Sequence, residues 1–164
     1  EQALRVLVVD DSPLARKHIA RVLGSLGIET IDQAGDGVEA LQLIEEHLYD
    51  FVVTDYNMPR MDGQELIDQI RNGATTSSLP VLMVTSEDNE NRLSAVQRSG
   101  VSAICDKPFE PVAGRLKIEP DRSGILLSYP HQYCHRQIAH TCDGNQTSTQ
   151  RWCFLKSGNQ QKCH

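Results

Sequence analysis

Residues 52–63 read VVTDYNMPRMDG, an apolar β-branched run that ends on a carboxylate. Valine and threonine favour strands, and Asp55 stands where the apolar run stops. Pro59 and Gly63 are typical of a loop that turns the chain into the next element. One aspartate at the end of a strand says little by itself. Its meaning depends on which residues the rest of the chain brings to the same place.

Composition restricts the class of protein. The chain has 164 residues and a net charge of −6, with no run of Lys and Arg, so nucleic-acid binding is disfavoured. No apolar stretch approaches the roughly 20 residues of a membrane helix, and no signal segment is apparent. We therefore expect a cytoplasmic protein that binds neither nucleic acid nor membrane.

The charge balance changes along the chain. Residues 1–110 contain 9 Lys/Arg and 19 Asp/Glu, whereas residues 111–164 contain 7 and 3. The second part also holds four of the five cysteines and shows hardly any amphipathic period. We expect a folded module followed by an atypical tail.

Apolar runs alternate with helical periods in the first part. The expected strands are 5–9, 28–34, 51–54, 80–85 and 101–105. The expected helices are 12–27, 36–47, 63–72 and 89–100, with Ser12 and Asp36 as N-caps and Gly100 at the last C-terminus. Strands that are apolar on both faces and alternate with helices predict an α/β fold, in which helices cover both sides of a five-stranded parallel sheet.

Polar residues follow the strands of this predicted sheet. Asp10 and Asp11 follow the first strand, Asp55 the third, Thr85 ends the fourth, and Lys107 follows the fifth. Ligands of open parallel sheets bind at the carboxyl ends of the strands, so these residues are expected to converge.

Three neighbouring carboxylates repel one another unless a cation intervenes. Mg²⁺ binds through carboxylates, waters and phosphate oxygens, so the acids predict Mg²⁺ and a phosphoryl group. Lys107 and Thr85 can bind phosphoryl oxygens. A carboxylate can also act as nucleophile and form an aspartyl phosphate, for which Asp55 is the natural candidate.

Four motifs together resemble the receiver domain of bacterial two-component response regulators, close to the chemotaxis type. They are VVDDS at 8–12, TDYNMPRMDG at 54–63, VTSED at 84–88 and DKPF at 106–109. The intervals also match: 45 and 44 residues from the acid pair to Asp55, 30 to Thr85 and 22 to Lys107. The resemblance spans about residues 4–118 and implies the doubly wound, flavodoxin-like strand order 2-1-3-4-5.

The resemblance implies roles for individual residues. Asp55 would accept the phosphoryl group from a sensor histidine kinase or a histidine phosphotransfer protein. Asp11, Asp55 and the main-chain carbonyl of Asn57 would bind Mg²⁺, with Asp10 acting through water. The protein would then switch a downstream output protein or domain, and would promote its own phosphorylation and dephosphorylation without being an enzyme in the usual sense.

The other site residues follow in the same way. Thr85 and Lys107 would bind the phosphoryl oxygens, and the peptide bond from Lys107 to Pro108 would be cis. The family usually has an aromatic residue three positions before the lysine, where this chain has Ile104. Coupling to the output face would therefore use a different rotamer change.

Asn57 and Glu87 lie two residues past Asp55 and Thr85. In receivers these places border the path of the hydrolytic water. We expect a short-lived phosphoryl group, with a lifetime of seconds to minutes.

The family pattern stops at Pro120. We therefore divide the chain into a receiver domain at 1–119 and an atypical tail at 120–164, which is expected to be poorly ordered or artefactual. A fifth helix would have to fit between Pro111 and Pro120 despite Gly114. In the tail, 124–129 and 151–155 are possible short strands.

Two other functions stay open at this stage. An aspartate-nucleophile phosphatase is disfavoured. Such enzymes have their nucleophile in a D-x-D motif at the first strand, whereas the candidate nucleophile of this chain, Asp55, follows the third. An interaction module that works without phosphorylation would be expected to have lost Asp55 or Lys107.

Overall fold

The computed structural model describes residues 3–109, 117–121, 124–130, 152–155 and 162–163. Within residues 3–109, strands and helices alternate as the periodicity predicts. The strands are β1 (Arg5–Val9), β2 (Thr30–Ala34), β3 (Phe51–Thr54), β4 (Val81–Thr85) and β5 (Ala103–Asp106). The helices are α1 (Pro13–Ser25), α2 (Gly37–Glu46), α3 (Gly63–Asn72) and α4 (Glu90–Arg98).

The five strands form one parallel sheet in the order β2-β1-β3-β4-β5, which confirms the predicted fold. The register pairs Val9 with both Ala34 and Thr54, and Thr85 with Asp106. The carboxyl ends of the strands therefore lie along one edge. The order in which strands are added to the sheet reverses between β1 and β3, and the ends of these two strands lie side by side at that edge. This is the edge at which the sequence places its polar residues.

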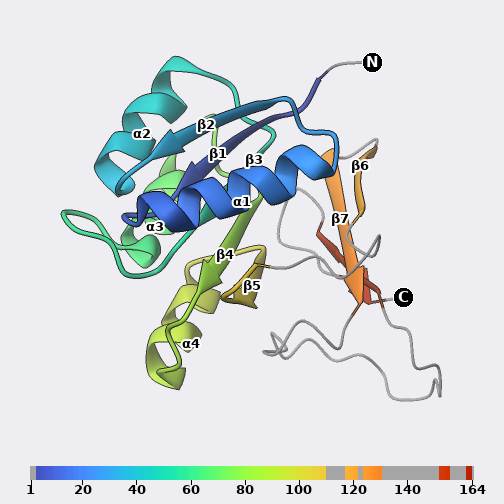
Figure 1. Ribbon diagram of the computed structural model, residues 1–164. Coiled ribbons are helices and arrows are strands. Elements are labelled where there is room, and N and C mark those ends of the chain that lie inside the picture. Colours follow the sequence, from blue (N-terminus) through green and yellow to red (C-terminus); the bar gives the residue numbers. More distant parts are fainter. Residues whose placement is uncertain (1–2, 110–116, 122–123, 131–151, 156–161, 164) are drawn as a thin grey trace.

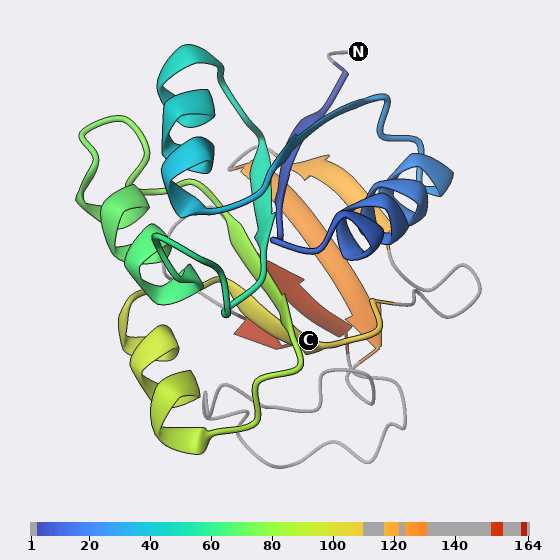
Figure 2. The same cartoon turned by 60° about the vertical axis from the view of Figure 1, so that its left-hand side comes forward.

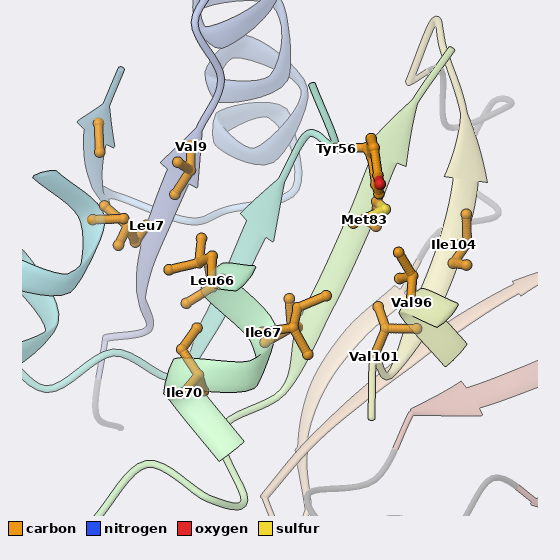
Figure 3. Close-up of a cluster of buried hydrophobic side chains, with 14 of the residues drawn as sticks. Leu7, Val9, Tyr56, Leu66, Ile67, Ile70, Met83, Val96, Val101 and Ile104 are labelled. Atoms are coloured by element: carbon orange, nitrogen blue, oxygen red, sulfur yellow. The ribbon is translucent and has the colours of Figure 1, made fainter. Parts of the chain in front are cut away.

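Helices cover the sheet on both sides (Figures 1 and 2). On one side Ile19 and Leu23 of α1 pack against the sheet in a buried cluster that includes Phe51. On the other side α2, α3 and α4 bury a second cluster, to which α3 contributes Leu66 and Ile70 (Figure 3). Every residue of β3 and β4 is buried, as expected of a parallel sheet covered on both faces.

Side-chain caps fix where the helices begin. Ser12 and Asp36 cap α1 and α2 as predicted, and Asp62 and Asn89 cap α3 and α4 in the same way. Each accepts a hydrogen bond from a backbone N–H of the first turn, which would otherwise lack a partner. Gly100, with φ of 95°, follows the C-cap of α4 in the left-handed conformation that glycine tolerates best.

A second sheet follows the receiver-like part. Its strands pair antiparallel in the order β6-β7-β8-β9, with bounds β6 (Lys117–Asp121), β7 (Gly124–Pro130), β8 (Trp152–Leu155) and β9 (Lys162–Cys163). In both views it lies on the α1 side of the first sheet (Figures 1 and 2). The two possible strands of the tail are confirmed as β7 and β8. The division at residue 119, which falls inside β6, stays a prediction.

The expected fifth helix is wrong for its C-terminal part. Residues 117–120 belong to β6, where Ile118 pairs with Leu127, and residues 110–116 lie outside the described residues. Gly114 and Pro120 disfavour a helix here. The neighbouring segment 124–130 instead offers an antiparallel partner.

None of the helices in the described residues combines the length and apolar character that a membrane span requires.

An ion-pair network ties the amino end of β1 to β2. Arg5 donates to Asp32 Oδ2 from Nε at 3.0 Å and from Nη2 at 2.7 Å, and the Tyr49 hydroxyl donates to the same oxygen at 2.6 Å. The Arg5 guanidinium also lies over the Tyr49 ring, 5.4 Å from its centroid. The Tyr49 hydroxyl and the Arg5 guanidinium hold the pKa of Asp32 below its usual value.

We expect Asp32→Asn to lower the free energy of unfolding by about 1 kcal/mol at pH 7. Because the folded-state pKa of Asp32 is lowered, its stabilisation is present above the unfolded pKa and is lost as pH falls through the folded value. The difference in the free energy of unfolding between parent and variant should therefore shrink below about pH 4. Urea unfolding at several pH values measures it.

Asp88→Asn serves as the control, since Asp88 is exposed and has no side-chain hydrogen bond within the described residues. A stability gap for Asp32→Asn that is as large in acid as at neutral pH would contradict the assignment.

Candidate functional site

Three acidic side chains meet at the carboxyl edge of the five-stranded sheet. Asp10 and Asp11 follow β1, and Asp55 follows β3. One carboxylate oxygen from each lies within 4.8 Å of the others. Asp10 and Asp55 are buried and Asp11 is exposed, so the cluster opens to solvent on the Asp11 side.

Lys107 brings a positive charge into this cluster. Its Nζ donates to Asp10 Oδ2 at 2.7 Å and to Asp55 Oδ2 at 3.0 Å. The peptide bond between Lys107 and Pro108 is cis, as expected. The backbone N–H of Lys107 donates to the carbonyl of Thr85 at 3.1 Å, which fixes the lysine beside the end of β4.

The charges of the cluster do not balance within the protein. Burial alone would lower the pKa of Lys107, but its bonds to Asp10 and Asp55 outweigh this and raise the pKa. The lysine is therefore fully charged at neutral pH. Three carboxylates and one ammonium leave two negative charges, and oxygen donors of this kind fit a hard divalent cation such as Mg²⁺.

Asp55 is held rigidly at the end of β3. Its backbone N–H donates to the carbonyl of Val9 at 2.9 Å, and its Oδ1 accepts from the N–H of Tyr56 at 2.7 Å. Oδ2 is bonded to Lys107. A Cβ on Gly63 would lie 2.3 Å from the carbonyl oxygen of Asp55, so only glycine permits this close turn into α3.

A second group of polar residues borders the site between β4 and α4. The Thr85 hydroxyl accepts from the N–H of Glu87 at 3.1 Å. Glu87 Oε2 accepts from Asn57 Nδ2 at 3.2 Å and from Arg92 Nη1 at 3.1 Å. The Asn57 amide, the N–H of Asn89 and the Arg92 guanidinium lower the pKa of Glu87, which is therefore charged.

Two arginines near the site carry no signal in the sequence. Arg16 of α1 donates from Nη1 to the main-chain carbonyl of Asp10 and from Nε to Gln33 Oε1 at 3.3 Å. Arg92 of α4 reaches Glu87. Helical periodicity marks both only as solvent-facing positions, so their bonds depend on how the loops fold back.

The structure brings most of the predicted site residues together. Asp10, Asp11, Asp55 and Lys107 form one cluster, and the backbone of Thr85 adjoins Lys107. Asn57 is exposed and joins the site rim through Glu87. Outside this group, His18 of α1 contacts the carbonyl of Phe109 through Nε2 at 3.0 Å.

We predict that Lys107→Met destabilises the protein by about 2 kcal/mol, because it leaves two carboxylates without their counter-charge in a site only partly open to water. Adding Asp10→Asn should recover much of this loss, since it removes one of the unpaired charges. Urea unfolding at pH 7 without divalent cations measures both.

Lys17→Met on the exposed face of α1 is the matched control. Equal stability of the Lys107 and Lys17 variants would show that the ammonium does not hold the cluster together.

Comparison with known proteins agrees with this geometry. The family model for the response regulator receiver domain matches residues 6–119. Chemotaxis protein CheY-3 of Vibrio cholerae is 34% identical over 116 residues, which are 71% of this chain and 89% of that protein. The chain thus spans nearly the whole of a chemotaxis-type relative.

Solved structures show the same likeness. Chemotaxis response regulator CheY4 of Vibrio cholerae is 30% identical, with a TM-score of 0.62 over 67% of this chain and 91% of that one. CheY in the CheX-CheY-BeF3-Mg²⁺ complex of Borrelia burgdorferi is 29% identical, with a TM-score of 0.61 over 65% and 80%. These matches do not favour a phosphatase or a phosphorylation-independent module. The chain belongs to the receiver domains of response regulators and is of the chemotaxis-like, CheY type.

Proposed function

We propose that the domain is a phosphorylation switch in which Asp55 is the phosphoacceptor. The observation that carries this is the placement of Lys107 Nζ 2.7 Å from Asp10 Oδ2 and 3.0 Å from Asp55 Oδ2, beside a third carboxylate on Asp11. A structural ion pair needs one acid and one base. The excess of acids at a ligand-binding edge of the sheet is what a metal-assisted phosphoryl site requires.

The donor would be a phosphohistidine on a sensor histidine kinase or a histidine phosphotransfer protein. A carboxylate oxygen of Asp55 forms a bond to phosphorus as the bond from phosphorus to the histidine nitrogen breaks. The electron pair stays on the imidazole nitrogen, which is reprotonated from solvent. The product is an aspartyl phosphate.

Asp11, Asp55 and the main-chain carbonyl of Asn57 would hold Mg²⁺, with Asp10 acting through water. When bound, Mg²⁺ would neutralise charge that accumulates on the phosphoryl oxygens. Lys107 is free to turn from the carboxylates to a phosphoryl oxygen, because its ammonium has three donors on a flexible stem. The Thr85 hydroxyl accepts from the Glu87 N–H and can donate its own proton to another phosphoryl oxygen.

The output signal would run from Thr85 to α4. Glu87 connects the two, since its N–H donates to the Thr85 hydroxyl and its carboxylate accepts from Arg92 of α4. Ile104 is 1% exposed and lies in one buried cluster with Val101 and with Val96 of α4 (Figure 3). Because Ile104 is already buried, we expect the readout to be a displacement of α4 that a cytoplasmic output partner recognises.

Incubation with Mg²⁺ and acetyl phosphate should add one phosphoryl group to the protein, seen as a mass shift of the intact chain. Asp55→Asn should abolish it, because the amide is not a nucleophile. Folding of the variant is checked by circular dichroism.

Other outcomes support other functions. Turnover of an external phosphoester would support a phosphatase. No modification of a folded parent protein, with or without Mg²⁺, would support an interaction module and would contradict the proposal.

The Asn57–Glu87 pair should set the lifetime of the phosphoryl group. These polar side chains border the entrance to the site, where they can orient an attacking water. We expect a lifetime of seconds to minutes, lengthened several-fold by Glu87→Ala. Loss of the phosphoryl mass shift after donor removal measures it, and a parent phospho-form that lasts hours with Mg²⁺ present would count against this role.

A further inference from the structure

Asp36 is a buried carboxylate that the phosphoryl chemistry does not use. Of the buried polar side chains in the described residues, Asp10, Asp55 and Thr85 belong to the site, and Thr54 donates to the carbonyl of Asp55. Asp36 is only 6% exposed and lies at the N-terminus of α2. Burying a carboxylate is costly unless it is paired and hydrogen-bonded.

Capping explains only one of its two oxygens. Asp36 Oδ1 accepts from the N–H of Glu39 at 2.9 Å, which caps α2. Serine, threonine or asparagine could do the same. Oδ2 instead accepts from Arg60 Nε at 2.8 Å and from Arg60 Nη2 at 2.6 Å. This second set of bonds links α2 to the loop between β3 and α3.

Arg60 adopts an unfavourable backbone conformation in this loop. Its φ is 64°, and no other non-glycine residue of the described chain has a positive φ. For an arginine this conformation is unfavourable, and it persists only where neighbouring interactions enforce it. The paired bonds to the buried Asp36 are such an interaction.

Two further contacts, one to α2 and one within the loop, hold the same loop in place. A Cβ on Gly37 would lie 2.7 Å from the Met61 side chain, so the first turn of α2 packs directly against the residue after Arg60. At the other end, the N–H of Gly63 donates to the carbonyl of Tyr56 at 2.8 Å. The loop is thus anchored to α2 in its middle, and the bond between Gly63 and Tyr56 closes it at its base.

Asn57 lies in this anchored loop, three residues before Arg60. Its carbonyl is the main-chain ligand proposed for Mg²⁺. Because Mg²⁺ demands near-ideal octahedral geometry, a small displacement of one ligand weakens binding. We propose that the Asp36–Arg60 ion pair is a positioning device for the phosphoacceptor loop, which holds the Asn57 carbonyl where Mg²⁺ requires it. This inference rests on the proposed function, since it concerns the same metal site.

Arg60→Gly separates positioning from stability. Glycine accepts the positive φ without strain, and this gain offsets the loss of the ion pair with Asp36, so the variant should unfold close to the parent's urea midpoint. Its dissociation constant for Mg²⁺, measured by isothermal titration calorimetry without a phosphodonor, should be about tenfold higher than that of the parent. At saturating Mg²⁺ the rate of phosphorylation by acetyl phosphate should approach that of the parent. Arg60→Lys, which keeps the charge but not the paired bonds, should give an intermediate affinity.

Arg5→Ala is the matched control, because it removes another Arg–Asp ion pair at the amino end of the sheet. It should lower stability and leave the affinity for Mg²⁺ unchanged. A general loss of rigidity would weaken Mg²⁺ binding in both variants.

The outcomes separate this inference from the proposed function. If the parent binds no Mg²⁺, the proposed function fails and the inference fails with it. If the parent binds Mg²⁺ and folded Arg60→Gly matches it within about twofold, only the positioning role is overturned. Should Arg60→Gly not fold, Asp36→Asn keeps the cap of α2, and parent-like affinity in that variant would overturn the inference equally.

Discussion

The ammonium of Lys107 between the carboxylates of Asp10 and Asp55 is the interaction on which the rest of the site depends. Buried carboxylates repel one another, and without a cation one of them would be driven toward protonation. A parallel sheet is what brings these groups together, because residues far apart in the sequence leave adjacent strands at the same edge. The lysine compensates part of the charge, and the remainder makes the edge a site for a divalent cation and a phosphoryl group.

Two polar links extend from this centre into the helices. Glu87 joins Asn57 at the site rim to Arg92 of α4, and Asp36 joins the loop after β3 to α2 through Arg60. Both links carry charge-assisted hydrogen bonds, which are stronger and more directional than neutral ones. The proposed division of roles follows from their positions: the link to α2 keeps the loop still, and the link to α4 transmits what happens at Thr85.

The sequence predicted the sheet and the meeting of Asp10, Asp55 and Lys107 at its edge, for identifiable physical reasons. Strands β3 and β4 are buried on both faces and β1 is nearly so, which makes their apolar runs unambiguous. Ser12 and Asp36 mark helix starts through cap chemistry. Asp10, Asp55 and Lys107 could be placed together because strand ends of a parallel sheet share an edge. Arg16, Arg60 and Arg92 could not, since their partners depend on loop paths that periodicity does not encode. The expected fifth helix was wrong at residues 117–120. These residues form a strand in which Ile118 pairs with Leu127, a partner that the family pattern does not include.

The most direct test is an amide NMR titration of the domain with beryllofluoride, a phosphoryl mimic, in the presence and absence of Mg²⁺. If the acid cluster and Lys107 form a metal-dependent phosphoryl site, the shifts should centre on Asp55, Thr85 and Lys107, should require Mg²⁺, and should vanish in Asp55→Asn. Shifts that appear without Mg²⁺, that survive in Asp55→Asn, or that lie away from this edge of the sheet would contradict it.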